Sequence, residues 1–136
     1  MARLVYAPGV WDMLHVGHLH FLTEAAKHGD LFVGVPADSV VREDKGAYPV
    51  IPELQRREMV AALKVVEGAV IYQTLDFIPQ LELLQPHVLA VGEEWGEAKR
   101  HKDAEDWMRS HGGVVVRISR FTGVSSSIIK QRIKQS

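Results

Sequence analysis

The sequence predicts an α/β fold, a single Rossmann-like doubly wound domain with a five-stranded parallel sheet. Apolar runs of strand length alternate with amphipathic runs of helix length along all 136 residues. The run 31–35 is apolar throughout, which is typical of strands buried on both faces of a parallel sheet. A glycine-containing turn with two histidines, residues 8–18, joins the first run to the first helix. We therefore expect residues 1–136 to form one domain.

Each expected element follows from its own pattern. Leu4–Ala7 is the first expected strand and Leu19–Lys27 the first helix, which ends at His28-Gly29. The other expected strands are residues 31–35, 69–72, 88–91 and 114–118. The other expected helices are residues 52–63, 77–84, 102–111 and 125–133. Residues 38–49 are polar and interrupted by Gly46 and Pro49, so we expect them to be mostly loop.

The composition excludes several classes of protein. Hydrophobic residues make up 46% of the chain, charged residues 24%, and the formal net charge is −1, so bulk charge indicates neither nucleic-acid nor membrane-surface binding. No apolar run has the length of a membrane span, and the first residues lack the apolar core of a signal peptide. The absence of cysteine excludes disulfides and thiolate metal sites. We expect a cytoplasmic protein that binds no nucleic acid and does not insert into membranes.

The turn at residues 8–18 is the candidate ligand site, because ligands of such sheets bind outside the carboxyl ends of the strands. The first turn of a helix has free N–H groups and a partial positive charge, which favour anions. His15 and His18 are three residues apart and share a face there, while Gly17 allows close approach to the backbone. Two imidazoles can donate hydrogen bonds to phosphate oxygens that gain charge during transfer. The turn suits a nucleotide polyphosphate.

His15-Val16-Gly17-His18 matches the HxGH signature of the nucleotidyltransferase superfamily. With Gly9-Val10-Trp11-Asp12 before it, the segment resembles the small bacterial cytidylyltransferases, above all glycerol-3-phosphate cytidylyltransferases. The resemblance covers nearly the whole chain and implies that His15 and His18 are catalytic. It also implies the following nucleotide contacts: Gly9, Val10, Trp11 and Gly17. Asp12 is placed on the acceptor side, although Trp11 can simply pack beneath the loop and Asp12 can be an Asx cap.

Two later motifs also follow expected strands. Residues 120–127 resemble the family's Arg-Thr-x-Gly-Ile-Ser-Thr-Thr, which holds the triphosphate, with Phe121 in place of the first threonine. The resemblance implies a catalytic Arg120. It also implies nucleotide contacts at Gly123, Ser125, Ser126 and Ser127, and one of the serines can instead cap the following helix.

The second of these motifs, Gly92-Glu93-Glu94-Trp95, resembles the family's Gly-Asp-Asp-Trp, which lines the base pocket largely through backbone groups. The resemblance assigns all four residues to nucleotide binding. Trp95 can stack on a ring or pack the loop. Two adjacent carboxylates without further ligands make a poor metal cage, so we expect no metal held by the protein.

Three basic residues complete the expected site. The resemblance implies that Lys45 points at the phosphates as a catalytic residue, and that Arg56 and Lys64 bind the acceptor. Lys64 stands where the glycerol-3-phosphate enzymes have arginine, whose planar fork holds phosphate differently. The alternative for each of the three is an ordinary solvated charge.

The expected activity is cytidylyl transfer. An oxygen of a small phosphate or phosphonate acceptor, by default glycerol 3-phosphate, attacks the α-phosphorus of CTP, and pyrophosphate leaves with Mg²⁺ carried by the triphosphate. Residues 45–57 also resemble adenylyltransferases acting on heptose phosphates or FMN, so an adenylyltransferase using ATP is the alternative. A non-catalytic nucleotide-binding module is another, while an aminoacyl-tRNA synthetase fragment is disfavoured by the short chain without a basic face. The family also implies a homodimer.

Overall fold

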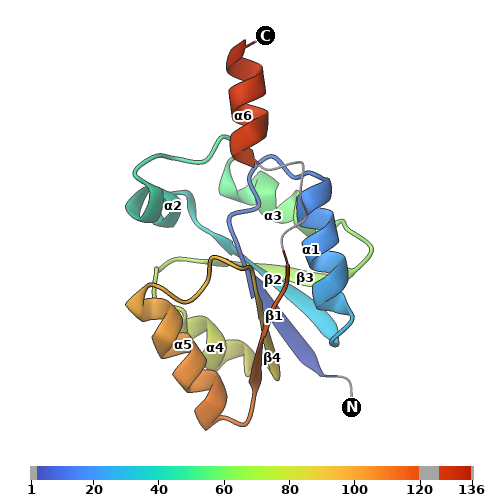
Figure 1. Ribbon diagram of the computed structural model, residues 1–136, viewed down its shortest axis with the longest axis vertical. Coiled ribbons are helices and arrows are strands. Elements are labelled where there is room, and N and C mark those ends of the chain that lie inside the picture. The colour runs from blue at the N-terminus through green and yellow to red at the C-terminus, as the bar shows by residue number, and fades with distance from the viewer. Residues whose placement is uncertain (1–2, 120–125, 136) are drawn as a thin grey trace.

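A computed structural model describes residues 3–119 and 126–135, and its centre is a five-stranded parallel sheet (Figure 1). The strands are β1 (Leu4–Pro8), β2 (Asp30–Pro36), β3 (Val66–Tyr72), β4 (Val88–Val91) and β5 (Val114–Arg117). Their order is β3-β2-β1-β4-β5, so the chain starts in the middle, runs out to one edge and then fills the other. This is the predicted doubly wound sheet, and its order reverses between β1 and β4.

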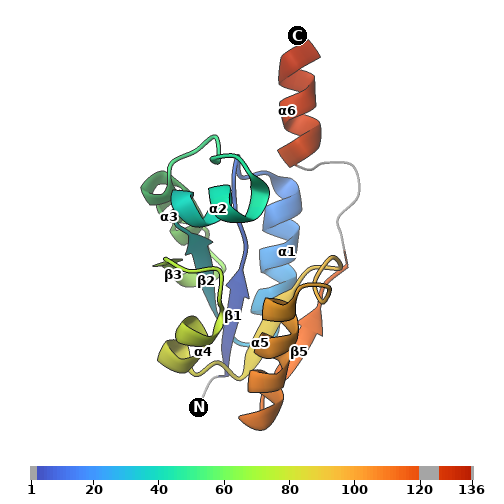
Figure 2. The ribbon, with the colours of Figure 1, turned by 90° about the vertical axis from the view of Figure 1, so that its left-hand side faces the viewer.

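Helices cover both faces of the sheet. The helices are α1 (Val16–Ala26), α2 (Asp38–Lys45), α3 (Glu53–Ala61), α4 (Ile78–Leu84), α5 (Lys99–Ser110) and α6 (Ser126–Gln135). α1 and α3 pack on one face and α4 and α5 on the other, while α6 extends away from the sheet (Figures 1 and 2). No helix within the described ranges is both long and apolar enough to cross a membrane.

Two hydrophobic cores follow from the alternation of side chains along the strands. Val5 and Ala7 of β1 pack with α1 and α3, whereas Tyr6 between them packs with α4 and α5. Leu22 of α1 and Leu81 of α4 are both fully buried, one in each core. Burial of a leucine contributes about 1.5–3 kcal/mol. The sheet thus lies between the two cores, one on each face.

Two expected boundaries were wrong near these carboxyl ends. Residues 38–49 are not mostly loop, because buried Val40 and Val41 anchor the helix α2 to the domain. Gly46, with φ 82°, is the residue that ends this helix, in the left-handed conformation common at helix ends. α1 begins at Val16 rather than Leu19, because His15 caps it, so the two histidines belong to the helix start itself.

Candidate active site

A cleft of about 770 Å³ opens at the carboxyl ends of β1 and β4, where the strand order reverses. Its volume lies in the range typical of sites for small molecules and cofactors. Most of the predicted site residues line this cleft: Gly9, Val10, Trp11, Asp12, His15, Gly17, His18, Lys45, Gly92, Glu93, Glu94, Trp95 and Ser127. Segments that are distant in the sequence therefore meet at one place, which sets the geometry of the site.

His15 and His18 are fixed by the cap of α1. The N–H of Gly17 donates to Nδ1 of His15 at 3.0 Å, and the N–H of His15 donates to Nδ1 of His18 at 3.1 Å. The two rings are stacked with their centroids 3.9 Å apart. Because both Nδ1 atoms accept hydrogen bonds, each neutral ring carries its proton on Nε2. The Gly17 N–H is thus engaged by His15, and each imidazole keeps its Nε2–H as a donor that these cap bonds do not use.

Burial keeps this pair uncharged. Burial lowers the pKa of His18 to about 4, with a further lowering from neighbouring His15 and a partial opposing effect of Asp12. Burial also lowers the pKa of His15. At neutral pH the cap therefore offers neutral hydrogen-bond donors, and an anion in the cleft would favour their protonated forms.

Trp11 supports the histidines from below. Its indole N–H donates to the carbonyl of Gly34 at 2.9 Å, and its ring meets His18 edge-on at 5.6 Å. The residue has φ 57°, and a Cβ on Gly9 would lie 2.7 Å from its ring, so the turn depends on the glycine. Trp11 is only 6% exposed. The Trp11 side chain therefore packs beneath the loop, which is one of the two roles that the sequence left open.

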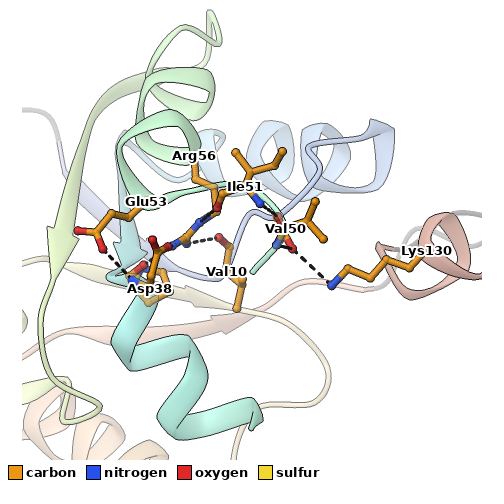
Figure 3. A network of polar contacts seen from close by, with 9 residues as sticks. Val10, Asp38, Val50, Ile51, Glu53, Arg56 and Lys130 are labelled. Carbon is orange, nitrogen blue, oxygen red and sulfur yellow. Dashed lines mark hydrogen bonds and ion pairs between the residues drawn. The ribbon is translucent and has the colours of Figure 1, made fainter. Parts of the chain in front are cut away.

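Arg56, which was predicted to bind the acceptor, is instead buried within the fold (Figure 3). Its guanidinium is fully buried and donates to the carbonyls of Ile51, Val10 and Pro36 and, at 2.7 Å, to the carboxylate of Asp38. Four hydrogen bonds occupy most of its five N–H donors. The arginine ties together the loops that follow β1 and β2 and the segment that leads into α3.

Asp12 and Lys64 also differ from the acceptor role expected for them. The Asp12 carboxylate accepts from the backbone N–H of Val50 at 2.8 Å and of Ile51 at 2.9 Å, and Lys130 of α6 lies 3.4 Å away (Figure 3). Asp12 is therefore a brace between two loops. Lys64 is exposed beyond the end of α3 and is not among the residues that line the cleft, because α3 ends at Ala61 and its C-terminus leads away to β3.

The loop after β4 is held by packing. The Trp95 indole donates to Glu105 at 3.2 Å, its ring stacks on His101 at 4.1 Å, and Arg117 donates to its carbonyl. Glu93 and Glu94 are exposed at the rim of the cleft. The Gly92-Glu93-Glu94-Trp95 motif therefore reflects the packing of this loop more than the selection of a base.

The last predicted motif is described only in part. Arg120, Gly123 and Ser125 lie outside the described residues. Ser126 is the first residue of α6, and Ser127 lines the cleft. Lys45 lies at the rim on the last turn of α2, with 61% of its side chain exposed.

Sequence reasoning missed one wall of the cleft, formed by Asp44, Tyr72, Phe77, Arg100 and His101. Tyr72 ends β3, so the rule that ligands bind beyond the strand ends could have found it. Arg100 and His101 belong to α5 and look like ordinary solvated residues in the sequence. Arg100 belongs to the cleft because it pairs with Asp44 at 2.9 Å, and His101 because its ring stacks on Trp95.

Comparison with known proteins places the chain in a family. The sequence profile of the cytidylyltransferase-like family matches residues 6–132, which include both histidines and every strand except the first two residues of β1. The chain belongs to the cytidylyltransferase-like family. Its HxGH segment is thus the signature of the nucleotidyltransferase superfamily, and the protein is a nucleotidyltransferase.

Individual relatives extend this placement. A protein named FAD synthase from Methanocella arvoryzae is 38% identical over 142 residues, covering 100% of this chain and 99% of that protein. A Bifunctional protein HldE from Geotalea uraniireducens is 36% identical over 97% of this chain but 27% of its own length. The solved structure of a lipopolysaccharide core biosynthesis protein from Thermoplasma volcanium GSS1 is 30% identical, covers 89% of this chain and 99% of its own, and superimposes with a TM-score of 0.77.

These relatives correct the expected substrates within the cytidylyltransferase-like family. Archaeal relatives at 33–43% identity are named FAD synthase, and FAD contains adenine rather than cytosine. The prediction of CTP with glycerol 3-phosphate or another small phosphate or phosphonate is therefore wrong. It rested on the resemblance of Gly92-Glu93-Glu94-Trp95 to the cytidylyltransferase motif, whose acidic side chains are exposed here.

Proposed function

We propose that this protein is an ATP:FMN adenylyltransferase, which forms FAD and pyrophosphate. The observation that carries the proposal is the relative named FAD synthase that aligns along the whole chain. FAD is FMN joined to AMP through a pyrophosphate linkage, so a nucleotidyltransferase makes it by moving AMP from ATP to FMN. This was the alternative that residues 45–57 suggested.

The proposed reaction is a single in-line displacement. A phosphate oxygen of FMN attacks the α-phosphorus of ATP, a new P–O bond forms, and the bond from that phosphorus to the bridging oxygen of the β-phosphate breaks. The electron pair leaves with pyrophosphate. The attacking phosphate is already an anion at neutral pH, so the site needs alignment and charge stabilisation rather than a general base.

The chain's own groups suit these tasks. The Nε2–H groups of His15 and His18 would donate to oxygens on the α-phosphate and on the departing pyrophosphate, and Lys45 would add a positive charge at the rim. Being neutral in the empty cleft, the imidazoles can gain a proton as negative charge accumulates. We propose the same triphosphate contacts for Arg120 and the serines after it.

Magnesium is part of this proposal as a companion of ATP, because phosphate oxygens are its preferred ligands. Within the described ranges, no three His, Cys, Asp or Glu side chains gather into a group suited to a metal ion. Asp12, the buried acid nearest the histidines in sequence, is held by two backbone N–H groups. When bound, the ion would supply neutralisation of phosphate charge.

The missed wall of the cleft supports an aromatic acceptor. Phe77 lies 6.0 Å from Tyr72, 5.2 Å from Trp95 and 6.1 Å from His101, measured between ring centroids. These rings come from the end of β3, the start of α4 and the β4–α5 region. A flat conjugated ring such as isoalloxazine gains favourable contacts from aromatic neighbours. We propose that this wall takes the flavin.

A second candidate is adenylyl transfer to a sugar phosphate. It is favoured by the similarity to a lipopolysaccharide core biosynthesis protein, because lipopolysaccharide cores are built of sugars. Of the two acceptors, FMN and a sugar phosphate, the aromatic wall favours FMN.

The test is a product assay with purified protein and Mg²⁺. ATP and CTP are each combined with FMN, heptose 1-phosphate and glycerol 3-phosphate, and products are separated by chromatography. FAD from ATP and FMN is the expected product, with equal release of pyrophosphate. Product only with a sugar phosphate would replace FMN by the second candidate. No product from any pair, with ATP bound, would favour the non-catalytic module.

A further inference from the structure

An ion pair closes one side of the cleft. Arg100, in the first turn of α5, donates to the carboxylate of Asp44, near the end of α2, at 2.9 Å. The two residues are 56 positions apart in the sequence, and each side chain is just over a quarter exposed. Both line the same cleft as His15 and His18. The pair therefore joins α2 to α5 along one side of the proposed active site.

The donors of Arg100 are only partly used. Its Nε is buried and has no hydrogen-bond partner anywhere in residues 3–119 or 126–135. Its hydrogen bond to Asp44 runs through one terminal nitrogen. A guanidinium presents a planar fork that fits two oxygens of a phosphate or carboxylate. Arg100 thus has unused capacity for an anion.

Asp44 serves two cations at once. Lys45 Nζ lies 4.0 Å from the Asp44 carboxylate that Arg100 also contacts. The carboxylate therefore balances more than one positive charge while the cleft is empty. A dianionic phosphate that reached this point would have both cations as partners.

The position of Arg100 distinguishes the acceptor from the triphosphate. Its neighbour His101 and the rings of Phe77 and Trp95 form the aromatic wall assigned above to the flavin. Charge from Arg100 also contributes to the lowered pKa of His101, after burial, so the two side chains act on each other. The neutral histidine donors that suit the triphosphate belong to α1 instead.

We propose that Arg100 binds the phosphate group of the acceptor, and that Asp44 holds this arginine in place until the phosphate displaces it. The proposal rests on the proposed function, because it takes FMN as the acceptor. It gives the acceptor the arginine that Arg56, buried and bonded within the fold, does not provide. Exchange of one anion for another costs little, because a partly exposed ion pair contributes little by itself.

The test compares Arg100→Ala and Arg100→Lys with Arg109→Ala. Arg109 is a matched control, because it lies on the same helix in an exposed ion pair with Asp106 and away from this cleft. Arg100→Ala should raise the KM for FMN about 10- to 100-fold, the usual loss for charge-assisted hydrogen bonds, and change the KM for ATP less than threefold. The KM for FMN of Arg100→Lys should lie between those of the wild type and Arg100→Ala, because lysine keeps the charge but lacks the planar fork. Arg109→Ala should match the wild type.

Binding without catalysis gives a second readout. Quenching of flavin fluorescence should show that the wild type prefers FMN to riboflavin, and that Arg100→Ala loses this preference. Asp44→Asn should lower the Kd for FMN or leave it unchanged. A wild type that makes FAD, together with an Arg100→Ala that keeps its preference for FMN, would overturn the role of Arg100 alone. A higher Kd in Asp44→Asn would overturn the displacement. A wild type that makes no FAD overturns the proposed function and this assignment with it.

Discussion

His15 and His18 cap the start of α1 and at the same time keep one N–H donor each. Each Nδ1 satisfies a backbone N–H of the α1 start, so the free proton of each neutral ring is on Nε2. Stacking at 3.9 Å keeps the rings together. The arrangement presents two Nε2–H donors without a permanent positive charge, as the proposed contacts with phosphate require.

The first prediction concerns catalysis by His18. His18→Ala should reduce the rate of nucleotidyl transfer by about 10²–10³-fold, as removal of a single transition-state donor does in comparable sites. Circular dichroism should be unchanged, and His28→Ala, an exposed residue beyond the end of α1, should keep wild-type activity. Activity of His18→Ala within a few-fold of the wild type would exclude the catalytic role.

The second prediction concerns acid stability. The pKa of His18 is lowered from 6.5 to about 4, so the unfolded chain binds more protons between these pH values and stability falls as pH drops from 6.5 toward 4. We expect this residue to account for about 2 kcal/mol, less than the full linkage value because solvent reaches part of the ring.

His18→Asn is the variant that isolates this effect, because its side-chain oxygen can still accept from the His15 N–H. Urea unfolding at pH 7 and at pH 4.5 should show a smaller loss of stability in the variant than in the wild type. Equal losses in both proteins would contradict a buried, neutral His18.

At the scale of elements, the site depends on loops that Arg56 and Asp12 hold together. Arg56 links the ends of β1 and β2 to the segment before α3, and Asp12 accepts two backbone hydrogen bonds from the same segment. An arginine at this spacing looks like a ligand-binding residue when only the sequence is known. Burial of the guanidinium, which depends on three separate loops, decides otherwise.

The third prediction follows from that burial. Arg56→Met should lower the free energy of unfolding by about 3 kcal/mol or more, because it leaves Asp38 and three carbonyls without their partner. Arg57→Met, at the next and exposed position, should change it by less than about 0.5 kcal/mol. An Arg56→Met protein of normal stability with only a higher KM for the acceptor would contradict this structural role and support acceptor binding.

At the scale of the whole molecule, α6 extends away from the sheet (Figure 2), and residues of its first two turns line the cleft. Lys130 of α6 approaches Asp12 at 3.4 Å, and Ser127 lines the cleft. The last helix is therefore connected to the turn that carries the histidines.

The fourth prediction tests this connection. Lys130→Ala should change the free energy of unfolding by less than about 1 kcal/mol, as expected for a partly exposed pair, and should raise the KM for ATP severalfold. Lys134→Ala, farther along α6 and outside the cleft lining, is the control. An unchanged KM for ATP in Lys130→Ala would show that the contact does not serve the nucleotide.

Sequence patterns sufficed for the strand alternation, the parallel sheet and the turn at its centre, because periodicity and a local motif encode them. They did not predict the helix α2, which two buried valines stabilise. They also did not predict that the Arg56 guanidinium is buried. The Arg100–Asp44 pair joins residues 56 positions apart and has no local signature. The expectation of CTP was wrong because it relied on the Gly92-Glu93-Glu94-Trp95 motif, which reflects packing around Trp95. Magnesium and the homodimer stay predictions.

The most direct measurement is a competition assay with equal concentrations of ATP and CTP and with FMN as the acceptor, followed by mass spectrometry of the flavin product. The account predicts FAD as the main product, formed with one pyrophosphate for each FAD and lost in His18→Ala. A flavin cytidine dinucleotide as the main product, or no flavin dinucleotide from a folded protein that binds ATP, would contradict it.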